Sequence, residues 1–130
     1  MNVQTLVSSV FSLDKSDMRA SLNEIGKQCM QAFEDAGSVA IPKEFRRHTA
    51  VLVVGMGGSA LGADFVRNLY GDMLKRPIKI SMDYTTPKWV SKDTLVILSS
   101  YSGDTEETLA QAHSILERTS KVVAITCGGA

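Results

Sequence analysis

The sequence predicts an α/β fold with a mostly parallel sheet and helices on both of its faces. Two short runs of apolar, largely β-branched residues, 50–54 and 95–98, are typical of buried strands, and two further stretches also fit strands. Stretches with apolar residues three or four positions apart alternate with them, as in amphipathic helices. Two loops rich in glycine and hydroxyl groups each follow such a run and open into a helical pattern. This order is that of a parallel α/β sheet.

The first predicted element is a helix over residues 14–36. We expect Asp14 to cap its start and Gly37 to cap its end. Cys29 belongs to its apolar stripe and is expected in the core. The other members of the stripe are Met18, Leu22, Ile25, Ala32 and Ala36.

Three elements follow as a strand, a helix and a second strand. Residues 50–54 are continuously apolar, which predicts a buried strand. Apolar residues recur every four positions over 59–74, which predicts a helix. Residues 78–82 alternate between apolar and polar and predict a strand.

The remaining pattern completes the sheet. Residues 83–93 can form little more than one helical turn. A strand over 94–99, a helix over 104–118 and a strand over 121–126 then follow. A complete domain would continue past the glycine turn at 127–130 into a further helix, so we expect a domain truncated after the fourth strand.

Composition narrows the classes of function. The 130 residues fit one domain, and 14 basic and 14 acidic residues cancel to a net charge of +0, which argues against nucleic acid as a partner. No run approaches the ~20 apolar residues of a membrane span. The first residues lack a charged start before a long apolar run, so no secretory signal is predicted and a cytoplasmic location is expected.

The first loop, residues 55–62, allows three interpretations. Gly55, Gly57 and Ala60 fit the dinucleotide fingerprint, and Asp83 after the next strand could bind a ribose. Glycines at a helix start also suit a phosphate group, because the backbone N–H groups can approach an anion closely. The glycines could equally serve only to permit a tight turn.

The second loop favours a phosphate. Ser100, Ser102 and Thr105 cluster after the third strand, and each hydroxyl can donate to a phosphate oxygen. The alternative is that the polar residues only cap the helix, which Asp104 could do with Glu107 in a capping box. Acidic side chains in the first helical turn would repel a phosphate, so they must point away or the hydroxyls must dominate binding.

Taken together, the two loops and their flanking stretches make the chain resemble the sugar isomerase (SIS) domain family, and within it the N-terminal domain of bifunctional phosphoglucose/phosphomannose isomerases. The stretches that carry the resemblance are VVGMGGSALGAD (53–64), DYTTPKWV (83–90), TLVILSSYSGDTEETL (94–109) and VVAITCGG (122–129).

The resemblance implies a flavodoxin-like three-layer αβα sandwich, with 1–130 as one domain made of an N-terminal helical segment (1–45) and an α/β core (46–130). It implies that a sugar phosphate is the ligand, with no metal and no redox cofactor. The phosphate would be bound by Gly57, Gly58, Ser59, Ser100, Ser102 and Thr105.

The implied reaction interconverts glucose 6-phosphate or mannose 6-phosphate with fructose 6-phosphate through a cis-enediol. The family's catalytic base and histidine belong to a second domain that these residues lack, and Asp104 stands where the isomerases often have Asn. Whether the chain is an enzyme is therefore left open. A non-catalytic module that senses a sugar phosphate and, less favoured, a dinucleotide-binding domain are the alternatives. Exposed apolar surface on the last strand further predicts a homodimer.

Overall fold

The computed structural model describes residue 2 and residues 10–129. The chain divides into two compact units, Met1–Ile41 and Pro42–Ala130. The predicted helical segment 1–45 and the predicted core 46–130 each include residues outside the described range. Among the described residues, no helix is both long and apolar enough to cross a membrane.

The first unit contains helix α2, Met18–Ser38, which starts four residues later than predicted. Asp17 is its N-cap, and its side chain accepts from the N–H of Ala20. The Asp14 carboxylate instead bonds the N–H groups of Met18 and Arg19, at 2.8 and 2.9 Å. No residue of α2 is buried. The expectation that Cys29 lies in a core is wrong: Cys29 is exposed, because none of the described residues of this unit buries the apolar stripe of α2.

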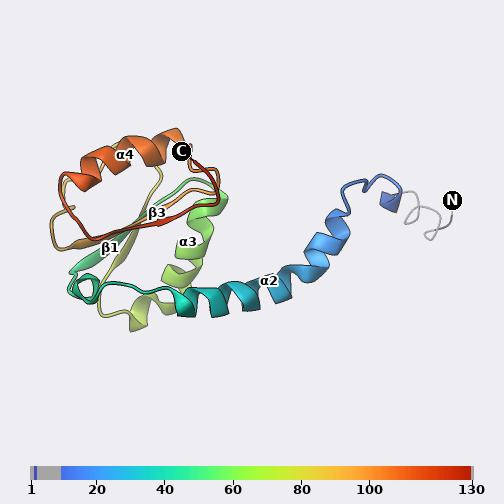
Figure 1. Cartoon of the computed structure of the whole chain (residues 1–130), viewed down its shortest axis with the longest axis horizontal. Helices are drawn as coiled ribbons and strands as arrows, with labels where there is room; N and C mark the ends of the chain where they lie inside the picture. Colours follow the sequence, from blue (N-terminus) through green and yellow to red (C-terminus); the bar gives the residue numbers. More distant parts are fainter. Residues whose placement is uncertain (1, 3–9, 130) are drawn as a thin grey trace. The chain divides into compact units, whose positions relative to one another are not determined.

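The second unit is built on a four-stranded sheet in which every pairing is parallel. The strands are β1 (Ala50–Val54), β2 (Ile78–Ser81), β3 (Thr94–Ser99) and β4 (Val122–Ile125). Their spatial order is β2-β1-β3-β4, which matches the first four positions of a flavodoxin-like sheet. The fold predicted from the sequence is confirmed, and all four strands fall where the pattern placed them (Figure 1).

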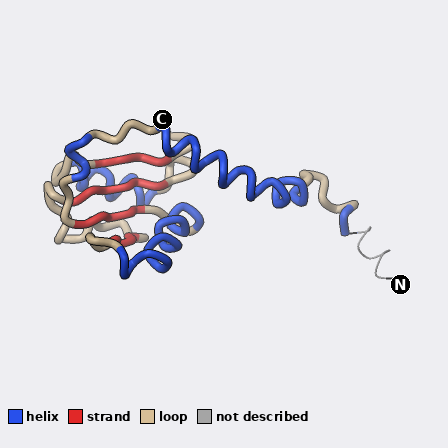
Figure 2. The backbone as a smooth tube through the Cα atoms, turned by 90° about the horizontal axis from the view of Figure 1, so that it is seen from below, coloured by secondary structure: helices blue, strands red, loops and turns tan. Residues whose placement is uncertain are grey.

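Helices cover both faces of this sheet. Helix α3 (Gly58–Tyr70) links β1 to β2, and helix α4 (Glu106–Leu116) links β3 to β4. The β1–α3–β2 and β3–α4–β4 connections run in opposite directions across the sheet. Because crossovers between parallel strands are right-handed, the two helices lie on opposite faces (Figures 1 and 2). A short 3₁₀ turn at Lys43–Arg46 precedes β1, and another at Gly71–Met73 directly follows α3.

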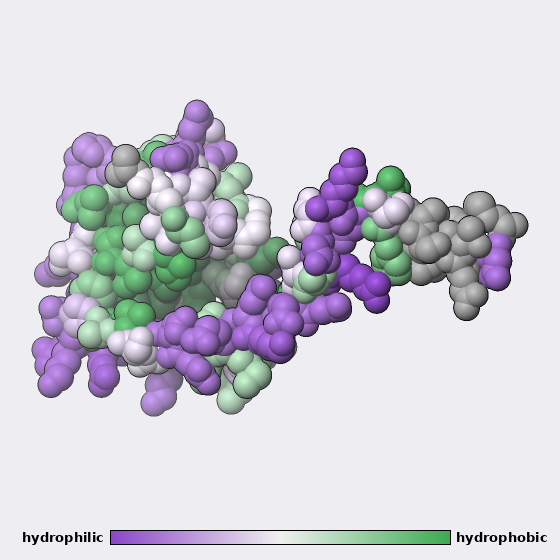
Figure 3. Space-filling view, turned by 45° about the vertical axis from the view of Figure 1, so that its right-hand side comes forward, coloured by the Kyte–Doolittle hydropathy of each residue, from purple (hydrophilic) through white to green (hydrophobic). Residues whose placement is uncertain are grey.

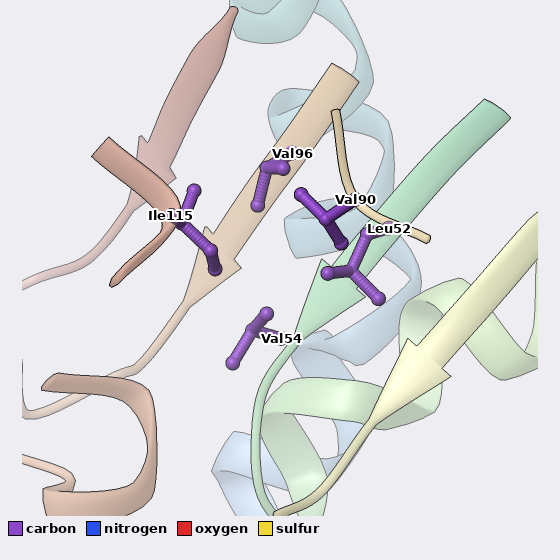
Figure 4. Packing of buried hydrophobic residues seen from close by; sticks show 5 residues of the cluster. All are labelled: Leu52, Val54, Val90, Val96 and Ile115. Atoms are coloured by element: carbon purple, nitrogen blue, oxygen red, sulfur yellow. The ribbon is translucent and has the colours of Figure 1, made fainter. Parts of the chain in front are cut away.

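The core lies between the sheet and α4. Leu52, Val54 and Val96 point from the sheet toward Ile115 of α4 and toward Val90, and all five are at most 5% exposed (Figure 4). Each such side chain contributes about 1.5–3 kcal/mol when fully buried. This face is the one that anchors α4.

The opposite face is only partly covered. An apolar hollow of about 260 Å³ lies beside α3, lined on the sheet side by Val51, Val53 and Ile97. The apolar residues whose four-residue spacing predicted α3 lie on the outward side of the helix, since Leu61, Phe65 and Leu69 are 65%, 66% and 55% exposed. Apolar surface is therefore prominent on this unit, and Figure 3 shows how apolar side chains gather there.

Residues 83–90, which we call the strap, replace a crossover helix between β2 and β3. The strap is fastened along α4 by Thr86, whose hydroxyl donates to the carbonyl of Gln111 at 3.3 Å. Arg118 just beyond α4 donates to the carbonyl of Pro87 at 3.1 Å. The strap ends at Val90, whose buried side chain packs into the core although the strap forms no helix.

Candidate ligand-binding site at the carboxyl edge of the sheet

Two loops lie side by side at the carboxyl edge, because they follow the neighbouring strands β1 and β3. From β1 the chain turns toward β2 on one side, and from β3 toward β4 on the other. Such a reversal of strand order opens a crevice in which α/β proteins bind ligands. The two loops singled out from the sequence flank this crevice.

The β1 loop is shaped by glycine where the backbones come close. A Cβ on Gly55 would lie 2.8 Å from the carbonyl oxygen of Ser99 in β3, so no side chain fits there. Gly57 has φ +52, which favours glycine, and it forms the N-cap of α3 without a side-chain cap. The predicted backbone donors Gly57 and Gly58 therefore start α3 at the crevice.

Ser59 joins the two loops directly. Its Oγ accepts a hydrogen bond from the backbone N–H of Tyr101 at 3.3 Å, across 42 residues of sequence. The structure thus brings Ser59 to the loop that carries the other predicted hydroxyls.

The hydroxyls of the β3 loop form a compact cluster. Ser100 Oγ lies 2.8 Å from Thr105 Oγ1 and accepts from the N–H of Gly103 at 3.1 Å. Ser102 Oγ accepts from the N–H of Asp104 at 3.2 Å. Ser100 is only 5% exposed, so the cluster reaches from the protein interior to the crevice.

These contacts correct two expectations. The N-cap of α4 is Thr105, which makes no side-chain capping bond, so Asp104 does not start the helix. The expectation that Asp104 alone accounts for the structural role of this loop, leaving the hydroxyls without one, is also wrong, since Ser100 and Ser102 hold the turn by accepting backbone N–H groups. The sequence pattern could not show this, because the bonds depend on how the loop turns.

The cluster can still donate to an anion. A hydroxyl that accepts a bond keeps its own proton, and the Ser100–Thr105 pair uses only one of its two protons internally. Helices α3 and α4 both begin here without a side-chain cap, and their first N–H groups favour negative charge. Residues 55–59 and 99–105 contain no Lys or Arg, so an anion would be held by neutral donors.

A third loop, residues 126–129 after β4, supports the second. Gly103 has φ +80, and a Cβ on it would collide with the backbone of Gly128 and Gly129. A Cβ on Gly128 would in turn lie 2.7 Å from the carbonyl oxygen of Ser102. The sequence pattern marks this glycine turn but does not predict its contact with the hydroxyl loop.

Other polar candidates have local partners. The Asp83 carboxylate accepts from the N–H groups of Tyr84 and Thr85, at 2.6 and 3.4 Å, and so forms a turn after β2. His48 Nδ1 lies 2.7 Å from the carbonyl oxygen of Phe45, and His113 lies exposed on α4. Within the described residues, no group of three or more His, Cys, Asp and Glu could hold a metal ion.

Residues 44–130 match the SIS domain family, and this stretch includes the three loops. The chain belongs to the SIS domain family. No solved structure matches the chain.

Curated relatives agree with the family. The chain is 36% identical over 112 residues to a bifunctional phosphoglucose/phosphomannose isomerase of Caldicellulosiruptor bescii, which covers 86% of this chain and 33% of that protein. It is 38% identical over 79 residues to an isomerase of the same name from Thermoplasma acidophilum, over 61% of this chain and 24% of that protein. A glucose-6-phosphate isomerase of Geotalea daltonii is 35% identical over 77 residues, which are 52% of this chain and 14% of that protein. The chain therefore spans a third or less of the length of these relatives.

Proposed function

We propose that the α/β unit binds the phosphate group of a sugar phosphate in the crevice between the β1 and β3 loops. The observation that carries the proposal is the Ser100–Thr105 hydroxyl pair, 2.8 Å apart beside the uncapped start of α4. Ser59 and Ser102 add hydroxyl donors, and Gly57 and Gly58 add backbone donors. The absence of cations in these loops fits a site that recognises phosphate by hydrogen bonds.

We further propose that this unit serves an aldose–ketose isomerisation of the kind that its relatives' names describe, between glucose 6-phosphate or mannose 6-phosphate and fructose 6-phosphate. In such a reaction a proton moves between C2 and C1 of the open sugar through a cis-enediol. These six residues would anchor the phosphate and so fix where C1 and C2 lie. The proton-transfer groups are assigned to the second domain of the family's enzymes.

A non-catalytic sensor of sugar phosphates is the second candidate. It is favoured by the position of the two histidines, since His48 precedes β1 at the opposite edge of the sheet and His113 is exposed on α4. This candidate predicts ligand binding without turnover. A coupled assay that detects steady isomerisation by the 130-residue chain would eliminate it.

The binding proposal is tested by calorimetric titration with glucose 6-phosphate, fructose 6-phosphate and inorganic phosphate. We expect binding of the sugar phosphates, weakened about tenfold by Ser100→Ala, because a hydrogen bond to a charged group contributes ~1.5 kcal/mol or more. Ser120→Ala, exposed before β4, is the matched control and should bind like the unchanged chain. No heat with either sugar phosphate at millimolar concentration would contradict the proposal.

We also propose that the protein forms a homodimer in the cytoplasm. The partly covered face beside α3 supports association, because its hollow and the exposed Leu61 and Phe65 leave apolar surface in water. Light scattering should give twice the mass of one chain. A monomer mass at working concentration would count against the dimer.

A further inference from the structure

The first turn of α4 raises an electrostatic problem for the site. Glu106 and Glu107 directly follow the N-cap Thr105, whose hydroxyl belongs to the proposed phosphate cluster. Their charges suit the positive end of the helix. A phosphate would occupy the same end, so carboxylates turned toward it would repel it.

Tyr84 of the strap contacts one of these carboxylates. Its hydroxyl donates to Glu106 Oε2 at 3.5 Å, across 22 residues of sequence. The nearby charge of Glu107, together with desolvation and the charge of Glu106, raises the pKa of Tyr84 above its ordinary value. The phenol is therefore hydrogen-bonded to Glu106 and senses the negative charge of both carboxylates.

The position of Tyr84 is fixed by a buried side chain. Gln111 of α4 is fully buried, and its Nε2 donates to Ser81 Oγ at 3.0 Å and to the carbonyl of Asp83. The Asp83 carbonyl is thereby bonded to α4, and the Asp83 carboxylate accepts the N–H of Tyr84 within the strap. The phenol is thus presented by a fastened strap.

The strap and the Ser100–Thr105 cluster follow different strands of the sheet. Tyr84 follows β2, whereas Ser100 follows β3, and β1 separates these two strands in the sheet. A carboxylate bonded to Tyr84 is consequently drawn toward the β2 side of α4.

We propose that Tyr84 is a positioning residue for phosphate binding: its hydroxyl holds the carboxylate of Glu106, in the first turn of α4, on the strap side and away from the Ser100–Thr105 cluster. This inference rests on the proposed function, since it assumes that the cluster binds phosphate. It gives the strap a role beyond closing the core.

The experiment measures the affinity of four chains for glucose 6-phosphate and for inorganic phosphate: unchanged, Tyr84→Phe, Glu106→Gln and the double variant. Tyr84→Phe removes one hydroxyl and should weaken binding about threefold to tenfold, because a freed carboxylate can turn toward the phosphate. The double variant should recover most of the affinity, since the Glu106 charge that Tyr84 would otherwise hold aside has been removed. Tyr70→Phe, half exposed at the end of α3, is the matched control.

A readout without ligand accompanies the titrations. The ionisation of Tyr84, followed by its ultraviolet absorbance as the difference from Tyr84→Phe, should shift to lower pH in Glu106→Gln because a negative neighbour has been removed. An unshifted phenol would overturn the inference, since Tyr84 would then not sense Glu106.

The binding results separate the two proposals. If the unchanged chain binds and Tyr84→Phe binds equally well, only the positioning role is overturned. The positioning role is also overturned if Tyr84→Phe weakens binding as much in the Glu106→Gln background as in the unchanged chain, because the hydroxyl would then act on the fold alone. If the unchanged chain binds neither probe, the proposed function fails, and the positioning role fails with it.

Discussion

Gly103 shows how a single residue sets the shape of the candidate site. It takes φ +80 and lies against the backbone of Gly128 and Gly129, where a Cβ would collide. Gly103→Ala should lower the free energy of unfolding by at least roughly 1–2 kcal/mol, the cost of the left-handed conformation, and more through the collision. It should also displace Ser100 and Thr105 and weaken phosphate binding. Urea unfolding and the calorimetric titration measure the two effects.

Gly26→Ala is the control for this change. Gly26 lies within α2, and a Cβ there meets nothing within 4 Å. Alanine should raise the stability of the helix by roughly 0.5–1 kcal/mol, because glycine is a poor helix former. If Gly103→Ala proves as harmless as Gly26→Ala, the packing of the glycine turn against the hydroxyl loop is contradicted.

The lowered pKa of Asp14 predicts how the start of α2 responds to pH. Hydrogen bonds from the backbone N–H groups of Arg19 and then Met18 lower the pKa of its carboxyl below 3.8. The ionised carboxylate therefore supports the helix start above the ordinary pKa, and this support is lost as the pH falls through the lowered value. A titration of the Asp14 side-chain resonances by NMR should give a midpoint below that of a free aspartate. Asp14→Asn should abolish the pH dependence of the Met18 and Arg19 amide shifts.

At the scale of elements, Gln111 joins α4, the strap and β2. Its amide supplies donors to Ser81 and Asp83 from a fully buried position. Gln111→Leu would leave the carbonyl of Asp83 without this donor and should cost about 1–3 kcal/mol in unfolding free energy. The exposed Gln31→Leu on α2 should stay within about 0.5 kcal/mol of the unchanged chain. Equal stability of the two variants would show that the strap does not depend on this amide.

The elements also show where sequence patterns suffice. Residues 50–54 and 94–99 are the strands β1 and β3 that the apolar runs predict, because a strand buried on both faces needs apolar side chains at every position. The predicted start of α2 is wrong, since Asp14 bonds backbone groups four and five residues ahead while Asp17 takes the N-cap. Both are acceptable caps by type, and only the backbone conformation distinguishes them.

For the whole molecule, the distribution of charge predicts how salt acts on binding. The chain has no net charge, and the two crevice loops carry no Lys or Arg, while Asp104 lies within the second loop and Glu106 and Glu107 follow it. Salt screens attraction to cations, but this site offers none in its loops. Raising the salt concentration from about 20 to about 200 mM should therefore change the affinity for glucose 6-phosphate by less than about threefold. A steep loss of affinity with salt would show that a cationic side chain takes part.

The sequence by itself determined the α/β class, the four strands and the loops of the candidate site, because hydrophobic periodicity and glycine placement are local properties. Only the tertiary structure decided which hydroxyls meet. Ser59 joins the Tyr101 backbone, Ser100 pairs with Thr105, and Tyr84 reaches Glu106. These contacts depend on the order in which the strands lie side by side, and that order follows from burying both faces of the sheet rather than from any one stretch of the chain.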